Sequence, residues 1–541
     1  MLKGVRLIYA LFSGVLLSLP WNQSFSGLFI LLALVPLLLI EDHACTSSFK
    51  KSSGLVFLYA SLTFFIWNVL STWWIADASV AGAITAIIVN TFLFSLIFWL
   101  FHITHKTLGS AVGYSSLIVY WTAFEYYYLN AEISWPWLNL GNAFANSYPL
   151  VQWYEYTGTL GGTAWALLVN VFLFLFLKKL LSRNNAKLNL YLTTCLILIM
   201  FPIGSSIFRY YTYVEAVNPC YIALIQPNFN SYNRQITIRQ KCSALIQLAD
   251  SVSDDSTDYI VAPEALIEGN LCESTVDKNF SIITLRDFVN SKKRATLILG
   301  ALTYRDYSPE EVRQNKANIV SSPAVIYDRY NSAVQIDKSD TIQFYHKSKL
   351  VVGIEKMPYP KALKFLKNLV EQFGGSFVSY GTQANRGVFM SPNHIARVAP
   401  VICYESIYGE FVTRYIKNGA NIIFIITNDG WWGNTPGYMQ HLSYARLRAI
   451  ETRRSIARSA STGISAFISQ RGDIVASTHW DKRTSIKGSV NLNDEKTFYV
   501  KHGDYIGKIS SLLSILFITI TLISYLFLPN RRKTFDIHAT L

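Results

Sequence analysis

Long apolar segments at both ends of the chain constrain its fold more than any other feature of the sequence. Eight such segments occupy residues 5–20, 25–41, 54–76, 80–102, 108–128, 163–181, 188–206 and 508–528. A helix of about 20 apolar residues crosses the hydrocarbon core of a bilayer. Hydrophobic residues make up 51% of the 541 residues and charged residues only 15%, which is unusual for a soluble protein. The sequence therefore predicts a membrane protein with eight spans.

The region between the seventh and eighth apolar segments has a different character. Residues 207–507 alternate charged and apolar stretches, as a globular domain does. We therefore expect a seven-helix transmembrane domain over 1–206, a globular domain over 207–507, a C-terminal transmembrane helix over 508–528 and a tail over 529–541. The first segment lacks a small-x-small cleavage site and another span follows at once, so it is interpreted as a retained helix rather than a signal peptide.

The basic residues of the membrane region predict its orientation. The three short loops on one side of the eight predicted spans contain no Lys or Arg. The tails and loops of the other side hold Lys3, Arg6, Lys50, Lys51, Lys106, Lys178, Lys179, Arg183, Lys187, Arg531, Arg532 and Lys533. Lys and Arg accumulate on the cytoplasmic side of membrane proteins. The tails are therefore predicted to be cytoplasmic and residues 207–507 to lie outside the inner membrane.

Charge and cysteine content exclude several classes of function. Much of the net charge of +14 belongs to the topological set just described, and no arginine-rich stripe or nucleic-acid-binding motif is present. A basic outer domain held against a bilayer is better matched to anionic lipid. The six cysteines are scattered; a disulfide among Cys220, Cys242 and Cys272 is compatible with an oxidising compartment, but its pairing does not follow from sequence. No metal-ligand spacing occurs, and we expect neither a metal nor a cofactor.

Three strand-like runs in the globular region each end in one polar residue suited to acyl-transfer chemistry. DYIVAPEAL delivers Glu264, TIQFYHKSKLV delivers Lys347 and APVICYES delivers Cys403. A carboxylate can deprotonate a thiol, and a lysine ammonium can stabilise a thiolate and an oxyanion. Taken singly, each residue is more often a turn, surface or buried structural residue. Their order, followed by TNDGWWG at 427–433, makes a shared site the better interpretation.

These segments resemble the Glu-Lys-Cys signature of the nitrilase (carbon-nitrogen hydrolase) superfamily. With PEAL, HKSKLVVGIEKMP, ICYES and TNDGWWG in this order, and with apolar segments on both sides, the chain is similar to the apolipoprotein N-acyltransferase branch of that superfamily. The motif-bearing resemblance covers residues 218–490. It implies a polytopic α-helical membrane domain joined to an α/β nitrilase-like αββα sandwich, and the alternating strand and helix patterns of the region agree.

The resemblance also implies roles for the residues. Glu264 is expected to act as base, Cys403 as nucleophile, and Lys347 with the Tyr404 amide as oxyanion donors. Glu355 and Glu405 match acidic positions that the family places near its nucleophile, and they could tune Glu264 or hold Lys347.

Substrate contacts are expected from four further residues: Tyr232, where the family carries a tryptophan, Trp431, Trp432 and Leu366. Leu366 belongs to a basic amphipathic pattern over 361–373, which fits a helix lying on the bilayer or an ordinary packed helix equally well. The tryptophans of STWWIAD and SWPWLNLGNAF fall at predicted membrane boundaries and are interpreted as bilayer anchors.

The expected function is transfer of a fatty acyl chain from a phospholipid, through a cysteine thioester, to the α-amino group of the N-terminal diacylglyceryl-cysteine of a lipoprotein. The expected setting is a monomer in the bacterial inner membrane. The alternatives are a membrane-tethered amidase that uses water as second nucleophile, and a transporter or scaffold that only binds. The intact Glu-Lys-Cys set argues against the last alternative. In addition, no intramembrane charged relay or broken-helix pattern supports transport.

Overall fold

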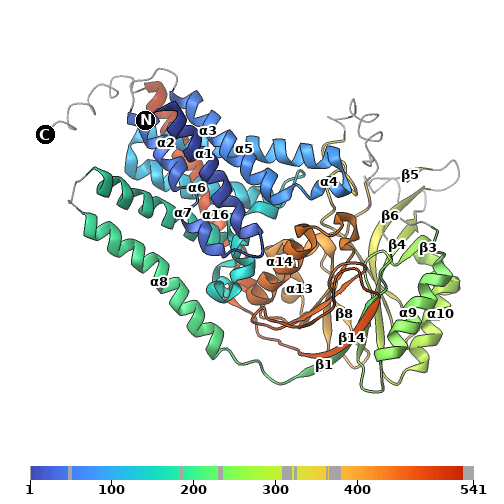
Figure 1. The fold of residues 1–541 in the computed structure, drawn as a ribbon. Coiled ribbons are helices and arrows are strands. Elements are labelled where there is room, and N and C mark those ends of the chain that lie inside the picture. Colours follow the sequence, from blue (N-terminus) through green and yellow to red (C-terminus); the bar gives the residue numbers. More distant parts are fainter. Residues whose placement is uncertain are drawn as a thin grey trace.

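The computed structural model describes residues 2–46, 52–182, 187–229, 235–307, 320–321, 326–360, 364 and 379–527. Its first part is a bundle of helices, and the last long helix returns to it from the far end of the chain (Figure 1). The helices of this part are α1 (Lys3–Ser18), α2 (Val35–Thr46), α3 (Ser52–Thr72), α4 (Ile75–Ala78), α5 (Val80–Leu108), α6 (Ser110–Asn130), α7 (Tyr154–Leu181), α8 (Leu188–Thr212) and α16 (Tyr505–Phe527).

Seven helical segments among the described residues are long and apolar enough to cross a membrane: Lys3–Trp21, Gly27–Thr46, Ser52–Thr72, Val80–Leu108, Tyr154–Leu181, Leu188–Thr212 and Tyr505–Phe527. The eighth predicted span, 108–128, forms the 21-residue helix α6, which packs against α5, α7 and α16 but is not among the seven. Tyrosine, serine and a glutamate interrupt its apolar sequence. That α6 also crosses the bilayer stays a prediction.

The globular part is a four-layer sandwich of helices and two sheets. One eight-stranded sheet has the order β14-β1-β2-β4-β6-β5, with β3 beside β4 and β7 beside β6. Its strands are β1 (Pro219–Gln226), β2 (Tyr259–Val261), β3 (Ile267–Cys272), β4 (Thr296–Asp306), β5 (Val320–Ser321), β6 (Ile326–Ile336), β7 (Gln343–His346) and β14 (Thr484–Asn491). The second sheet runs β13-β12-β11-β10-β9-β8. Its strands are β8 (Phe389–Met390), β9 (Arg397–Ile402), β10 (Ile422–Thr427), β11 (Ile456–Ala460), β12 (Ala466–Ile468) and β13 (Ile474–Ser477).

Helices cover the outer face of each sheet. α9 (Ile238–Val252) and α10 (Phe280–Ser291) pack together over the first sheet, while α13 (Gly409–Lys417) and α14 (Pro436–Thr452) cover the second (Figure 1). Between the sheets the packing is apolar, with the rings of Tyr259 and Phe424 5.1 Å apart. Every residue of β10, IIFIIT, is buried, as a central parallel strand covered on both faces requires. The predicted αββα arrangement is confirmed.

The α13–α14 layer faces the membrane bundle, so the two parts share one interface. The short helix α15 (Phe498–His502) also packs on α7. Trp21 Nε1 donates to Tyr444 Oη at 2.9 Å, and Gln440 Nε2 donates to the Trp21 carbonyl oxygen at 3.0 Å. Arg453 Nε donates to Glu155 Oε2 at 2.7 Å in the same interface. A single apolar core runs from the bundle through α14 into the second sheet. The globular part is therefore packed into the membrane domain and not merely tethered to it.

Most tryptophans interpreted as bilayer anchors lie inside this interface instead. Trp74 and Trp137 are fully buried, with ring centroids 5.0 Å apart. The ring of Trp135 stacks on that of Trp137 at 5.2 Å. Only Trp73 is substantially exposed, at 48%. The anchor interpretation is wrong for the buried rings, because hydropathy at a span boundary does not distinguish a lipid-facing ring from one covered by a second domain.

Candidate active site

The three segments chosen from sequence end at the same edge of the sandwich. Glu264 follows β2 and Lys347 follows β7, both of the first sheet, while Cys403 directly follows β9 of the second. Ile402 of β9 pairs with Ile426 of parallel β10, so Cys403 leaves β9 at the level of Thr427, the last residue of β10. Because the sheets face each other, residues leaving both at this edge meet between them.

Lys347 is the centre of the buried charges. Its Nζ donates to Glu264 Oε1 and to Glu355 Oε1, each at 2.9 Å. Lys347 is 1% exposed, Glu264 7% and Glu355 9%. Burial alone would lower the pKa of Lys347, but the two carboxylates outweigh it and raise that pKa well above its usual value. The lysine is therefore held as an ammonium.

Two amide groups that the sequence did not indicate complete this arrangement. Asn331 Nδ2 donates to Glu264 Oε1 at 2.8 Å and to Glu355 Oε1 at 2.9 Å, so it ties the two carboxylates together. The backbone N–H of Asn428, which follows β10, donates to Glu264 Oε2 at 3.1 Å. Both oxygens of Glu264 are thus held, by the interior of β6 through Asn331 and by the ends of β7 and β10 through Lys347 and Asn428.

The Cys403 side chain is presented by a strained turn. Its φ of +48° lies in the left-handed region, which costs a non-glycine residue about 1–3 kcal/mol. Burial raises the pKa of the thiol, the charge of Glu264 adds to the rise, and Lys347 opposes it. Burial therefore favours the neutral thiol over the thiolate at Cys403.

Glu405 holds the lysine segment and the cysteine segment together. Its Oε1 accepts from the Ser348 amide at 2.6 Å and from Tyr345 Oη at 2.8 Å, and its Oε2 accepts from the Ile402 amide at 2.9 Å. Ser348 follows Lys347 and Ile402 precedes Cys403. Glu405 is fully buried, and burial raises its pKa despite these donors. It is placed as a positioning residue, distinct from Glu355, which touches the lysine directly.

A second buried charge cluster lies behind Cys403. One nitrogen of His441, Nε2, lies 3.2 Å from the Cys403 carbonyl oxygen, and the other, Nδ1, lies 3.0 Å from Asp429 Oδ1. Arg458 Nη2 donates to Asp429 Oδ2 at 2.7 Å. Burial would raise the pKa of Asp429, but Arg458 and His441 lower it to about 2. The cluster fixes the backbone of the turn at Cys403. Glycine at position 463 leaves room for the Asp429 carboxylate, since a Cβ there would lie only 2.2 Å from Asp429 Oδ2.

The bundle contributes to the surroundings of Cys403 through the loop that follows α6. Tyr404 Oη donates to the Ser134 carbonyl oxygen at 2.9 Å, and its ring stacks near Trp135 at 5.9 Å. Trp432 lies 5.1 Å from Trp74, centroid to centroid, whereas Trp431 is 42% exposed. Of the two tryptophans predicted to contact substrate, Trp432 is thus part of the domain interface. A substrate role for either, and for the Tyr404 amide as oxyanion donor, stays a prediction.

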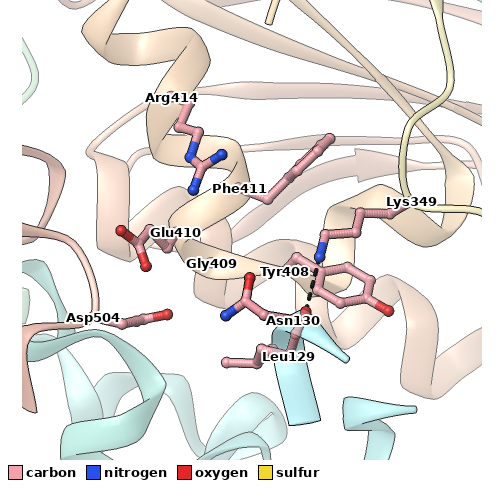
Figure 2. Close-up of a pocket in the computed structure, with 9 residues that line it drawn as sticks. All are labelled: Leu129, Asn130, Lys349, Tyr408, Gly409, Glu410, Phe411, Arg414 and Asp504. Carbon is pink, nitrogen blue, oxygen red and sulfur yellow. Dashed lines mark hydrogen bonds between the residues drawn. The ribbon is translucent and has the colours of Figure 1, made fainter. Parts of the chain in front are cut away.

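A polar pocket lies beside the site at the boundary between the two parts (Figure 2). It is lined by Leu129, Asn130, Lys349, Tyr408, Gly409, Glu410, Phe411, Arg414 and Asp504. Lys349 Nζ donates to the Leu129 carbonyl oxygen at 2.8 Å and lies over the Tyr408 ring. Burial, with nearby cations second, lowers the pKa of Lys349 to about 8. The pocket wall reaches the nucleophile segment through Tyr408, whose ring lies 5.4 Å from that of Tyr404.

Two of the predicted substrate contacts, Tyr232 and Leu366, lie outside the described residues, as does nearly all of the amphipathic segment 361–373. All six cysteines are free in the structure, so Cys220, Cys242 and Cys272 are thiols.

Fold and site together define a carbon-nitrogen hydrolase fused to a membrane domain. Residues 221–498 match the carbon-nitrogen hydrolase family model, which is about half of the chain, and the chain belongs to that family. Residues 13–172 match the apolipoprotein N-acyltransferase N-terminal domain.

Curated relatives resemble the chain over nearly its whole length. The apolipoprotein N-acyltransferase of Chlorobaculum tepidum is 28% identical over 88% of this chain and 88% of its own. The enzyme of Geobacter metallireducens is 26% identical over 92% of this chain and 91% of its own length. That of Thermotoga maritima is 24% identical over 96% of this chain and 94% of its own length.

Proposed function

We propose that the chain is an apolipoprotein N-acyltransferase that moves an acyl chain from a phospholipid to the α-amino group of a diacylated lipoprotein by way of a thioester on Cys403. The observation that carries the proposal is the buried contact of Glu264 and Lys347 beside Cys403, at an edge of the sandwich that packs directly on membrane helices. A lipid substrate accounts for this packing, whereas a soluble substrate would not require it. The relatives, which bear this name and match the chain over about nine-tenths of its length, support the same choice.

In the first half-reaction Glu264 removes the proton from Cys403 Sγ as the sulfur attacks the ester carbonyl carbon. Negative charge develops on the carbonyl oxygen, where the Lys347 ammonium and a backbone N–H stabilise it. When the tetrahedral intermediate collapses, the carbon–oxygen ester bond breaks and Glu264 returns the proton to the departing alcohol. The products are a lysophospholipid and an acylated Cys403.

The second half-reaction uses the same groups in the same order. The α-amino group attacks the thioester carbonyl, Glu264 accepts a proton from the nitrogen, and the same oxyanion donors act again. Collapse breaks the carbon–sulfur bond, and the proton on Glu264 returns to the sulfur. Because the first product leaves before the second substrate reacts, the kinetics are expected to be ping-pong.

A membrane-tethered amidase is the second candidate, since it would share these residues and differ only in using water to release the acyl group. The apolar interface around Trp74, Trp137 and Trp432 favours the transferase, because it places the nucleophile segment against the bundle and not in open solvent. A scaffold that only binds would not require the strained turn at Cys403.

The setting follows from the same reasoning. The seven apolar helices make the chain a multi-pass membrane protein. We place it in a bacterial inner membrane, as a monomer, with the globular domain in the periplasm and no cofactor. A reporter enzyme that works only after export should be active when it is fused after residue 300. Activity there of a reporter that works only in the cytoplasm would contradict this placement.

The central experiment uses the purified full chain in detergent with phospholipid alone. Intact mass spectrometry should show one added acyl chain, and peptide mapping should place it on Cys403. Cys272→Ser, which removes another buried thiol of the same domain, is the matched control and should still be acylated. Adding a diacylated lipopeptide should discharge the acyl group to its amine. Discharge to water at the same rate with or without the peptide would favour the amidase, and no adduct at all would reject both enzymes.

A further inference from the structure

Side chains of a kind that can bind a metal ion lie together between helices α2 and α5 of the membrane bundle, both of which Figure 1 shows. Glu41 and Cys45 are one turn apart on α2, and His102 and His105 are one turn apart on α5. Glu41 and His102 are fully buried and His105 is 5% exposed. Ionisable side chains buried in a membrane bundle are costly and usually have a definite task.

The distances bring carboxylate, thiol and imidazole together. His105 Nδ1 lies 3.0 Å from each oxygen of Glu41, and one ligand atom each from Glu41, Cys45 and His105 all lie within 4.8 Å of one another. Bonds of about 2.0–2.3 Å around a tetrahedral zinc ion separate its ligand atoms by roughly 3.3–3.8 Å. The three atoms can therefore close around an ion with side-chain adjustment alone.

Surrounding residues hold these groups in the manner of a metal site. His102 Nδ1 lies 2.7 Å from Glu41 Oε1, so it orients the carboxylate or supplies a fourth ligand. The far nitrogen of His105, Nε2, lies 3.3 Å from Ser110 Oγ, and that of His102 lies 3.3 Å from Ser53 Oγ. Hydrogen bonds to the far nitrogen are what fix the ring of a metal-bound histidine.

We propose that Glu41, Cys45 and His105 bind a divalent transition-metal ion of the zinc class, which joins α2 to α5. Imidazole, thiolate and carboxylate are all ligands that such an ion accepts, whereas magnesium and calcium avoid the thiol. Binding would displace the protons of Cys45 and of His105 Nδ1. The role is structural, because the cluster contacts none of the groups assigned to acyl transfer. Without an ion, the same residues would form only a His–Glu–His hydrogen-bond network.

The test separates these two states by a signal that only a metal–sulfur bond gives. The full chain, purified without chelator, should carry about one zinc ion per molecule by elemental mass spectrometry. After chelation and addition of cobalt(II), a thiolate-to-cobalt charge-transfer band should appear. Cys45→Ser should lose the band while keeping acyl transfer, and Cys195→Ser, which removes a different buried thiol of the bundle, should keep it.

A thermal measurement provides the second readout. Chelation should lower the unfolding temperature of the wild-type chain, and added zinc should restore it, whereas Cys45→Ser should respond to neither. No bound metal together with no charge-transfer band in the wild type would overturn the proposal, as would a band that Cys195→Ser removes and Cys45→Ser does not.

Discussion

Replacing Glu405 with glutamine should reduce catalysis far more than its conservative size suggests. The carboxylate accepts from the Ser348 amide on one oxygen and from the Ile402 amide on the other. A glutamine amide has one oxygen and one NH₂ group. In either orientation, the NH₂ therefore faces a buried backbone N–H beside either Lys347 or Cys403.

The expected free-energy cost of Glu405→Gln follows from this single mismatched hydrogen bond. A hydrogen bond to a charged group contributes about 1.5–3 kcal/mol, and leaving a buried donor unsatisfied costs about 1–3 kcal/mol. These terms overlap, so we expect a total of about 2–4 kcal/mol. If the cost falls on the geometry of the reacting groups, acylation should slow by about 30- to 1000-fold.

The assay is the rate of acyl-adduct formation on Cys403 in single-turnover conditions, measured on the same preparation as the thermal unfolding midpoint. Glu268→Gln is the matched control, because Glu268 is half-exposed and pairs with Lys241, away from both segments. Its exposed ion pair contributes at most about 1 kcal/mol, so its acylation rate should be close to wild type. An unchanged acylation rate per folded molecule of Glu405→Gln, with only a lower midpoint, would refute the positioning role.

Further substitutions test the other parts of the site. Cys403→Ser should abolish adduct formation and keep the unfolding midpoint, since an alcohol has the shape but not the nucleophilicity of the thiol; full activity would remove Cys403 from the mechanism. Lys347→Ala should slow both acylation and discharge by about 100-fold or more, because every tetrahedral intermediate loses an oxyanion donor; an effect on only one half-reaction would contradict that role. Gly300→Ala should impair acylation, because a Cβ there would lie 2.5 Å from the Glu264 Cα, whereas the same change at open Gly54 should be silent. Burial raises the pKa of Asp504 from 3.8 to about 6, so the folded chain binds a proton there more tightly than the unfolded chain does. The resulting contribution to stability is complete below pH 3.8 and is lost as the pH rises through 6, a change of about 3 kcal/mol. Asp504→Asn should therefore flatten the fall of the unfolding midpoint between about pH 4 and 6.5, and the same pH dependence in the variant and the wild type would count against this assignment.

The sequence predicted those parts of the site that stand at the ends of strands. Glu264, Lys347 and Cys403 each follow an apolar run, and a polar residue after such a run can be recognised from the sequence alone. The two facing sheets of the sandwich then bring them together because strand ends of both sheets share one edge. The apolar helices could be predicted from the sequence equally well, except that the composition of α6 is too mixed to decide whether it crosses the membrane.

Residues that act through distant partners could not be predicted in this way. Asn331 lies within a strand and looks like an ordinary polar residue until Glu264 and Glu355 are placed on either side of it. His441 lies on a helix whose spacing gives no sign that it reaches the Cys403 carbonyl. The Glu41, Cys45 and His105 cluster comes from two helices about 60 residues apart, so neither segment alone shows a metal-ligand pattern.

The turn that carries Cys403 is held from two sides, and one of them belongs to the membrane domain. Behind it, His441 and Asp429 fix the backbone carbonyl of the turn. In front, Tyr404 is tied to Ser134 in the loop that leaves α6. A strained turn keeps its conformation only when its surroundings determine it. The bundle therefore forms part of the scaffold of the Cys403 turn, and the globular domain separated from it would expose its buried aromatic face and release one of the two constraints on Cys403.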